Sequence, residues 1–123
     1  MDLVRILLVD DQAAYLRAMS SVVEETPGFV VVGEALSGEE AIAVATLVAP
    51  DLVLMDVNLP GIDGLEATRL LRAGECPPVV VLLSTYDEDA GDQFVAESGA
   101  AAYVIKSAIG PDRLRVVWRA AVP

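Results

Sequence analysis

The sequence of 123 residues contains no histidine, one cysteine and one lysine, and these absences exclude several kinds of chemistry. Without histidine, the chain cannot form a His-based zinc site or a Ser-His or Cys-His nucleophile pair, and it cannot serve as a phosphohistidine carrier. Cys76 has no partner for an intrachain disulfide, so a reducing compartment is expected. Any chemistry in this chain must therefore depend on carboxylates, hydroxyls and Lys106.

Positive charge and long apolar runs are also scarce. Eight Lys and Arg residues stand against 19 Asp and Glu, and the net charge of −11 argues against direct nucleic acid binding, which needs clustered cations. Although 54% of the residues are hydrophobic, no apolar run approaches the roughly 20 residues that span a bilayer. The apolar stretch near the N-terminus is too short for a signal peptide. We expect one cytoplasmic domain that does not contact a membrane.

Apolar runs typical of buried strands alternate with helical patterns along the sequence. The expected strands span residues 4–10, 29–35, 51–56, 79–84 and 102–106. The expected helices span residues 12–26, 37–49, 64–74, 88–100 and 110–122. Ser37 and Glu40 form a capping-box pattern at the start of the second helix. Five strand–helix units predict an α/β fold, with an open, doubly wound parallel sheet that helices cover on both faces.

Polar residues follow four of the five expected strands. In such sheets ligands bind beyond the carboxyl ends of the strands, so the residues there are candidate site residues. They are Asp10 and Asp11, Asp56, Ser84 and Thr85, and Lys106. Each alone could be an ordinary turn or strand-end residue. Their joint occurrence at one edge of the sheet favours a functional site.

Three neighbouring carboxylates repel one another, and burial would raise their pKa values. A hard divalent cation and the ammonium of Lys106 would both relieve this repulsion. Mg²⁺ prefers carboxylates, water and phosphoryl oxygens as ligands. A site with these groups suits phosphoryl transfer, in which positioning and charge neutralisation supply most of the catalysis. A carboxylate can itself be the nucleophile and form an aspartyl phosphate.

Four sequence motifs together resemble the receiver domain of two-component response regulators. They are LLVDDQ, DLVLMDVNLPGIDGLE, VVVLLSTYDED and GAAAYVIKS, and the resemblance covers essentially the whole chain. It implies a single flavodoxin-like or CheY-like (βα)5 domain over residues 1–123, with a five-stranded parallel sheet in the order 2-1-3-4-5. Such a domain is not an enzyme, beyond catalysing its own phosphorylation and dephosphorylation.

The resemblance also implies roles for the acidic residues. Asp56 would accept a phosphoryl group from the phosphohistidine of a sensor histidine kinase, which is the expected partner. Asp11 would bind Mg²⁺ directly and Asp10 through water, with Asp56 and the backbone carbonyl of Asn58 as further ligands.

Other residues would sense the phosphoryl group. Ser84 and Lys106 would contact it, and the separation of Ser84 from Lys106 favours this serine over Thr85. Tyr103 would rotate inward to complete a switch that begins at Ser84, although the neighbouring Tyr86 could carry the change instead.

The subgroup is suggested by VVGEALSGEEAI and STYDED, which resemble the NarL/LuxR type. Ser107 stands where many receivers have proline, and Gln12 stands where this subgroup more often has histidine. The subgroup implies a helix-turn-helix DNA-binding domain after residue 123, and switching of a surface that controls homodimerisation or this output domain, with transcription as the output. The alternative is a stand-alone or degenerate receiver that acts as a protein-interaction module.

Two other classes use similar features but do not match. A haloacid-dehalogenase-like phosphatase requires a second acid two residues after its nucleophile, where this chain has Asn58. A flavodoxin-like cofactor binder needs a phosphate loop rich in Ser, Thr or Gly after the first strand. The segment DDQAAY would instead repel a phosphate in the absence of a metal.

Overall fold

Within residues 2–85 and 90–122, which the computed structural model describes, five strands alternate with five α-helices. The elements are β1 (Val4–Val9), α1 (Ala13–Glu24), β2 (Phe29–Ala35), α2 (Gly38–Val48), β3 (Leu52–Asp56), α3 (Gly64–Arg72), β4 (Val79–Ser84), α4 (Gly91–Ser98), β5 (Ala102–Ile105), the 3-10 turn η1 (Lys106–Ala108) and α5 (Pro111–Ala121). The predicted alternation of strands and helices is therefore confirmed.

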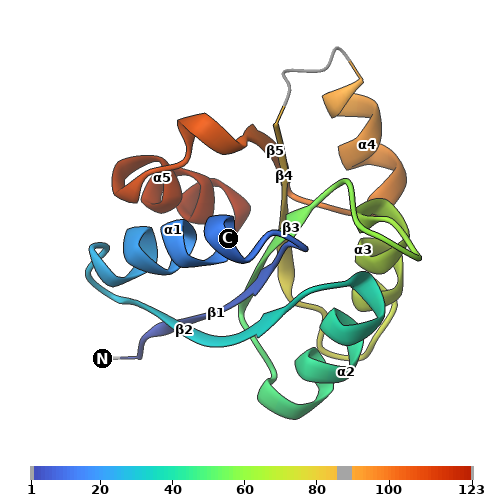
Figure 1. The fold of residues 1–123 in the computed structure, drawn as a ribbon, viewed down its shortest axis with the longest axis horizontal. Coiled ribbons are helices and arrows are strands. Elements are labelled where there is room, and N and C mark those ends of the chain that lie inside the picture. Colours follow the sequence, from blue (N-terminus) through green and yellow to red (C-terminus); the bar gives the residue numbers. More distant parts are fainter. Residues whose placement is uncertain (1, 86–89, 123) are drawn as a thin grey trace.

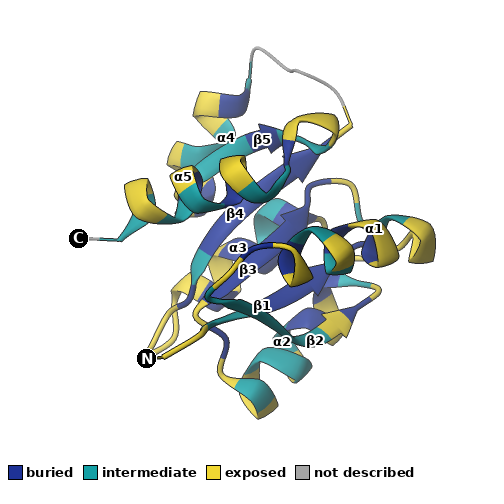
Figure 2. Cartoon of the chain, turned by 90° about the vertical axis from the view of Figure 1, so that its left-hand side faces the viewer, coloured by how far each residue is buried: buried dark blue, intermediate teal, exposed yellow. Residues whose placement is uncertain are grey.

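The strands form one parallel sheet in the order β2-β1-β3-β4-β5 (Figure 1), as predicted. Helices α1 and α5 cover one face, and α2, α3 and α4 cover the other (Figure 1). Because both faces are covered, the central strands are buried along their length and need no polar alternation (Figure 2). None of the described helices combines the length and the apolar character of a membrane-spanning segment.

Successive residues of each strand contribute to two separate cores. Ile6 of β1 packs under α1 and α5, whereas Leu7 packs under α2 and α3. The same division holds in β3 for Leu54 and Met55. This two-sided packing fixes the register of each strand, since a shift by one residue would exchange the two sets of side chains.

The predicted capping box at the start of α2 is present. The backbone N–H of Glu40 donates to Ser37 Oγ at 3.1 Å, and Glu40 Oε1 accepts from the backbone N–H of Leu36, also at 3.1 Å. The return bond therefore reaches one residue further back than the standard motif. Asp63 caps α3 in the same way, by accepting from the N–H of Glu66 at 2.8 Å.

Several predicted boundaries were wrong by one to a few residues. The strand predicted to end at Lys106 ends at Ile105, because Lys106 opens η1. The helix predicted over residues 88–100 begins at Gly91 and ends at Ser98, where Gly99 adopts φ +84°. Residues 88 and 89 lie outside the described part of the chain.

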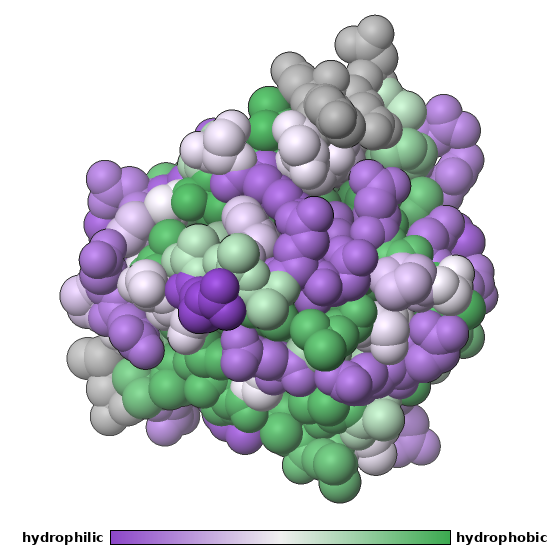
Figure 3. Space-filling view, viewed as in Figure 1, coloured by the Kyte–Doolittle hydropathy of each residue, from purple (hydrophilic) through white to green (hydrophobic). Residues whose placement is uncertain are grey.

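The surface is not uniformly polar. In the space-filling view, hydrophobic residues gather along the lower edge, where Figure 1 draws α2 (Figure 3). Leu47 of α2 is 84% exposed. After its first turn, the exposed face of α2 therefore has fewer polar side chains than surface helices usually have.

Ala49, which follows α2, adopts a left-handed conformation with φ 47° and ψ 66°. This conformation disfavours residues with a Cβ atom, and glycine is the usual residue at such helix ends. We predict that Ala49→Gly raises the free energy of unfolding by about 0.5–1 kcal/mol, measured by urea denaturation. Ala73 is the matched control, since it ends α3 at φ −81°. Ala73→Gly should not stabilise the protein, and equal effects of the two substitutions would contradict this explanation.

Candidate functional site

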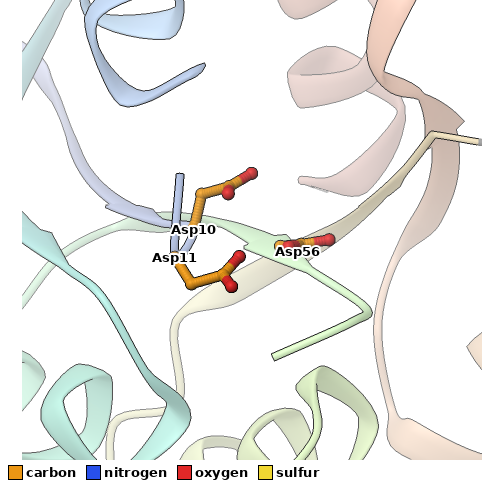
Figure 4. A group of neighbouring side chains, drawn as sticks. All are labelled: Asp10, Asp11 and Asp56. Carbon is orange, nitrogen blue, oxygen red and sulfur yellow. The ribbon is translucent and has the colours of Figure 1, made fainter. Parts of the chain in front are cut away.

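Three carboxylates meet at the carboxyl ends of the neighbouring strands β1 and β3. Asp56 is the last residue of β3, and Asp10 follows Val9, which pairs with Met55. Asp11 comes next in the chain, and its side chain points toward the same space (Figure 4). One carboxylate oxygen from each residue lies within 4.8 Å of those from the other two. The structure therefore brings together the three acids that the sequence singled out.

The ammonium of Lys106 lies beside two of these acids. Its Nζ atom is 2.5 Å from Asp10 Oδ2 and 3.6 Å from Asp56 Oδ1. Lys106 follows β5 and so reaches the acids from the far side of β4. Asp10 and Asp56 are both buried, and the pairing places a positive charge where two negative charges would otherwise repel each other.

Backbone N–H groups orient the two buried carboxylates. The N–H of Gln12 donates to Asp10 Oδ1 at 2.8 Å, and the N–H of Asn58 donates to Asp56 Oδ1 at 3.2 Å. Each acid is thus held by the residue two positions later in the chain. Asp11 is exposed and lies at the open side of the site.

The pKa of Asp56 is raised to about 6. Burial is the largest cause, and the negative charge of Asp10 adds to it. The charge of Lys106 and the hydrogen bond from the N–H of Asn58 lower the pKa, and the charge of Asp11 raises it. A cation placed among the three acids would counteract the repulsive contributions.

Ser84 and Tyr103, predicted as switch residues, lie on the adjoining strands. Ser84 is the buried last residue of β4 and pairs with Ile105, the residue before Lys106. Tyr103 lies on β5, and its ring packs against Phe94 of α4 with ring centroids 6.0 Å apart. Tyr86, the alternative switch residue, lies outside the described residues.

Tyr15 is a site residue that sequence reasoning missed. Its hydroxyl donates to the backbone carbonyl of Lys106 at 3.2 Å, and its ring centroid lies 4.5 Å from Lys106 Nζ. Burial, followed by the negative charges of Asp10 and Asp56, raises the pKa of Tyr15 above its usual range. The sequence pattern placed Tyr15 only within the helix expected over residues 12–26. Its position one helical turn after Asp11 was the signal that could have identified it.

Gly64 was also missed. A Cβ atom at this position would lie 2.1 Å from the backbone oxygen of Asp56, so only glycine allows α3 to begin this close to β3. The N–H of Gly64 donates to the carbonyl of Val57 at 2.9 Å. The start of α3 is therefore fixed against the backbone of Asp56 and its neighbour.

The chemistry of the donor set fits a hard divalent cation. All three acids offer oxygen atoms, which Mg²⁺ prefers over nitrogen and sulfur ligands. The same arrangement sets a carboxylate oxygen of Asp56 near an ammonium that can attract an anionic group. The site could thus hold a metal ion and an anion side by side.

The raised pKa of Asp56 predicts how stability depends on pH in the absence of divalent metal. Between about pH 4 and pH 6 the folded state holds a proton on Asp56 that the unfolded state has lost. Stability should therefore fall as the pH rises through this range and stay lower above it. Asp56→Asn removes this titration. The difference in free energy of unfolding between Asp56→Asn and the wild-type protein should therefore grow from near zero at pH 4 to about 1–3 kcal/mol in favour of the variant at pH 8.

Urea denaturation at each pH, with a chelator present, measures this difference. Asp2→Asn removes the same charge from an exposed position and separates the local effect from the change in net charge. An advantage of Asp56→Asn that is equal at pH 4 and pH 8 would show that burial does not control the titration of Asp56.

Comparison with known proteins gives a consistent result. Residues 6–118 match the family model of the response regulator receiver domain. The chain is 40% identical over 106 residues to the response regulator GacA of Pseudomonas viridiflava, a match that covers 86% of this chain and 50% of GacA. It is 32% identical over 105 residues to the transcriptional regulatory protein LiaR of Bacillus subtilis, a match that covers 85% of this chain and 50% of LiaR. The chain thus spans about half the length of the curated relatives it matches.

Solved structures share the fold. The signal receiver domain of the response regulator NarL from Mycobacterium tuberculosis superposes with a TM-score of 0.88 at 28% identity, covering 98% of both chains. A LuxR-family response regulator from Aurantimonas superposes with a TM-score of 0.86 at 34% identity, covering 97% of this chain and 84% of that one. These matches support the NarL/LuxR subgroup that the motifs suggested.

Proposed function

Because this chain belongs to the family of response regulator receiver domains, we propose that Asp56 accepts a phosphoryl group from the phosphohistidine of a sensor histidine kinase. One observation supports this role above the others. The Asp56 carboxylate is buried at a strand end, with the Lys106 ammonium 3.6 Å away and two further acids within reach of one metal ion. A carboxylate in such a setting can act as a nucleophile toward an anionic group.

Mg²⁺ is the proposed cofactor. Asp11, Asp56 and the backbone carbonyl of Asn58 would hold it directly, and Asp10 would act through water. The existing bonds of Asp10 to Lys106 and to the N–H of Gln12 support this indirect role. When bound, the ion would supply positive charge that neutralises the phosphoryl oxygens.

In the proposed reaction, an Oδ atom of Asp56 forms a bond with phosphorus while the bond between phosphorus and the kinase histidine nitrogen breaks. That nitrogen keeps the electron pair. The carboxyl of Asp56 must be ionised to attack, and with a pKa of about 6 it is mostly ionised at neutral pH. The ammonium of Lys106 attracts the phosphoryl oxygens, and the same groups would serve when water later removes the phosphoryl group.

A surface switch is the proposed consequence of phosphorylation. The phosphoryl group would offer new acceptor oxygens to Ser84, at the buried end of β4. Tyr103 packs against α4 through Phe94 and Gly91, where a Cβ atom on Gly91 would lie 2.9 Å from the tyrosine ring. A shift of β4 would therefore change how Tyr103 packs, and with it the surface around α4.

The proposed output is transcription. The matches cover only about half of each of these relatives, and LiaR is named a transcriptional regulatory protein. We infer that the native protein continues into a helix-turn-helix DNA-binding domain and forms a homodimer on activation. The charge of −11 supports assigning DNA binding to that further domain. The proposal includes a cytoplasmic location, in keeping with the single cysteine.

Phosphorylation of Asp56 can be tested directly. With Mg²⁺ and a small acyl phosphate donor, the wild-type domain should gain one phosphoryl group by intact mass, and Asp56→Asn should gain none. A chelator should abolish the gain, because the charge on the phosphoryl oxygens is then not neutralised. Asp92→Asn, an exposed carboxylate on α4, is the matched control and should react like wild type. Equal labelling of Asp56→Asn would place the acceptor elsewhere.

The switch can be followed by ¹⁹F NMR of fluorotyrosine-labelled protein. A beryllofluoride mimic of the phosphoryl group should shift the Tyr103 signal, and Ser84→Ala should abolish that shift while the mimic still binds. Gly91→Ala should move the signal without the mimic, because the added Cβ atom displaces the ring. A Tyr103 signal that is unchanged by the mimic in the wild-type domain would refute this coupling and leave the acceptor assignment standing.

A further inference from the structure

Lys106 must be held in one place to act on a phosphoryl group, and its side chain is long and flexible. Asp10 restrains the ammonium at 2.5 Å. The proposed metal would share the charge of Asp10, so the attraction between Asp10 and Lys106 would weaken when the site is loaded. A second restraint that carries no charge would hold Lys106 in both states.

Tyr15 has the geometry of such a restraint. Tyr15 lies on α1, 91 residues before Lys106 in the sequence. It contacts both the backbone of Lys106 and the ammonium at the end of its side chain. Its hydroxyl donates to the backbone carbonyl at 3.2 Å, and its ring lies 4.5 Å from Nζ, well inside the range of a cation–π contact. The first contact fixes the start of η1, and the second limits where the ammonium can move.

We propose that Tyr15 is a positioning residue that holds the Lys106 ammonium toward Asp56 through its ring and hydroxyl. This inference rests on the proposed phosphorylation of Asp56 and deepens it. The ring attracts the ammonium by its face and leaves the N–H groups able to donate to carboxylate or phosphoryl oxygens. Tyr15 does not touch the reacting atoms and acts only through Lys106.

The Lys106 side chain provides a test that does not depend on phosphorylation. Because the sequence has one lysine, protein labelled with ¹³C-lysine gives a single signal from the methylene beside the ammonium. The face of an aromatic ring moves nearby proton signals upfield. We expect an upfield signal in the wild-type protein and in Tyr15→Phe, which keeps the ring, and a normal signal in Tyr15→Leu. A normal signal in the wild-type protein would overturn the inference.

The rate of phosphorylation gives the functional test. At saturating Mg²⁺ and with a small acyl phosphate donor, Tyr15→Leu should slow labelling of Asp56 by about 3- to 30-fold, as expected from the loss of a cation–π contact. Tyr15→Phe should restore most of the rate. In a Lys106→Met background, Tyr15→Leu should have less than about a twofold further effect, because Tyr15 then has no ammonium to position.

Phe29→Leu is the matched control. Phe29 is a half-buried aromatic residue that packs against the same core as Tyr15, at the opposite end of the sheet from Lys106. It should change neither the lysine signal nor the rate. Equal losses from Tyr15→Leu with and without Lys106 would show that Tyr15 only supports the fold, and would overturn the inference. If the wild-type protein were not phosphorylated at all, the proposed function would fail and the lysine signal would decide the role of Tyr15.

Discussion

The ion pair between Lys106 and the buried acids Asp10 and Asp56 is the interaction on which this site depends. Two carboxylates buried side by side are unfavourable, and a third stands at the opening. The ammonium makes the arrangement tolerable, but the pKa of Asp56 stays raised, first by burial and then by the negative charge of Asp10. The site therefore remains suited to further positive charge. The burial of negative charge, together with this repulsion, is the physical basis for expecting a divalent cation.

The sheet makes this pairing possible because its register is fixed from both sides. Val9 lies opposite Met55, and so the acids that follow them emerge at the same level. Separate cores on the two faces resist a slip of either strand. The relative positions of the acids thus depend on apolar packing well away from them. The acids need only follow strands that this packing has already aligned.

Patterns local in sequence predicted most of this arrangement. Apolar runs that end in Asp10 and Asp56 identified the strands and the acids, and Ser37 with Glu40 identified the start of α2. Contacts between distant segments were not predictable in the same way. An aromatic residue in a helix is usually a core residue, and the contact of Tyr15 with Lys106 exists only once folding brings α1 and the start of η1 together. The extent of η1 and the steric demand at Gly64 likewise depend on neighbours that no local pattern specifies.

The hydrogen bond from Gly64 to Val57 limits where the sequence between β3 and α3 can change during evolution. This bond joins the two ends of the segment between β3 and α3, so that this segment forms a loop closed at its base. Within this loop Leu59 and Ile62 pack against the core and Asp63 caps α3. Pro60 is exposed and has neither role, so a substitution there would leave α3 and Asp56 in their relative positions. Relatives could therefore vary this exposed position and acquire new partner specificities there, with the chemistry beneath it unchanged.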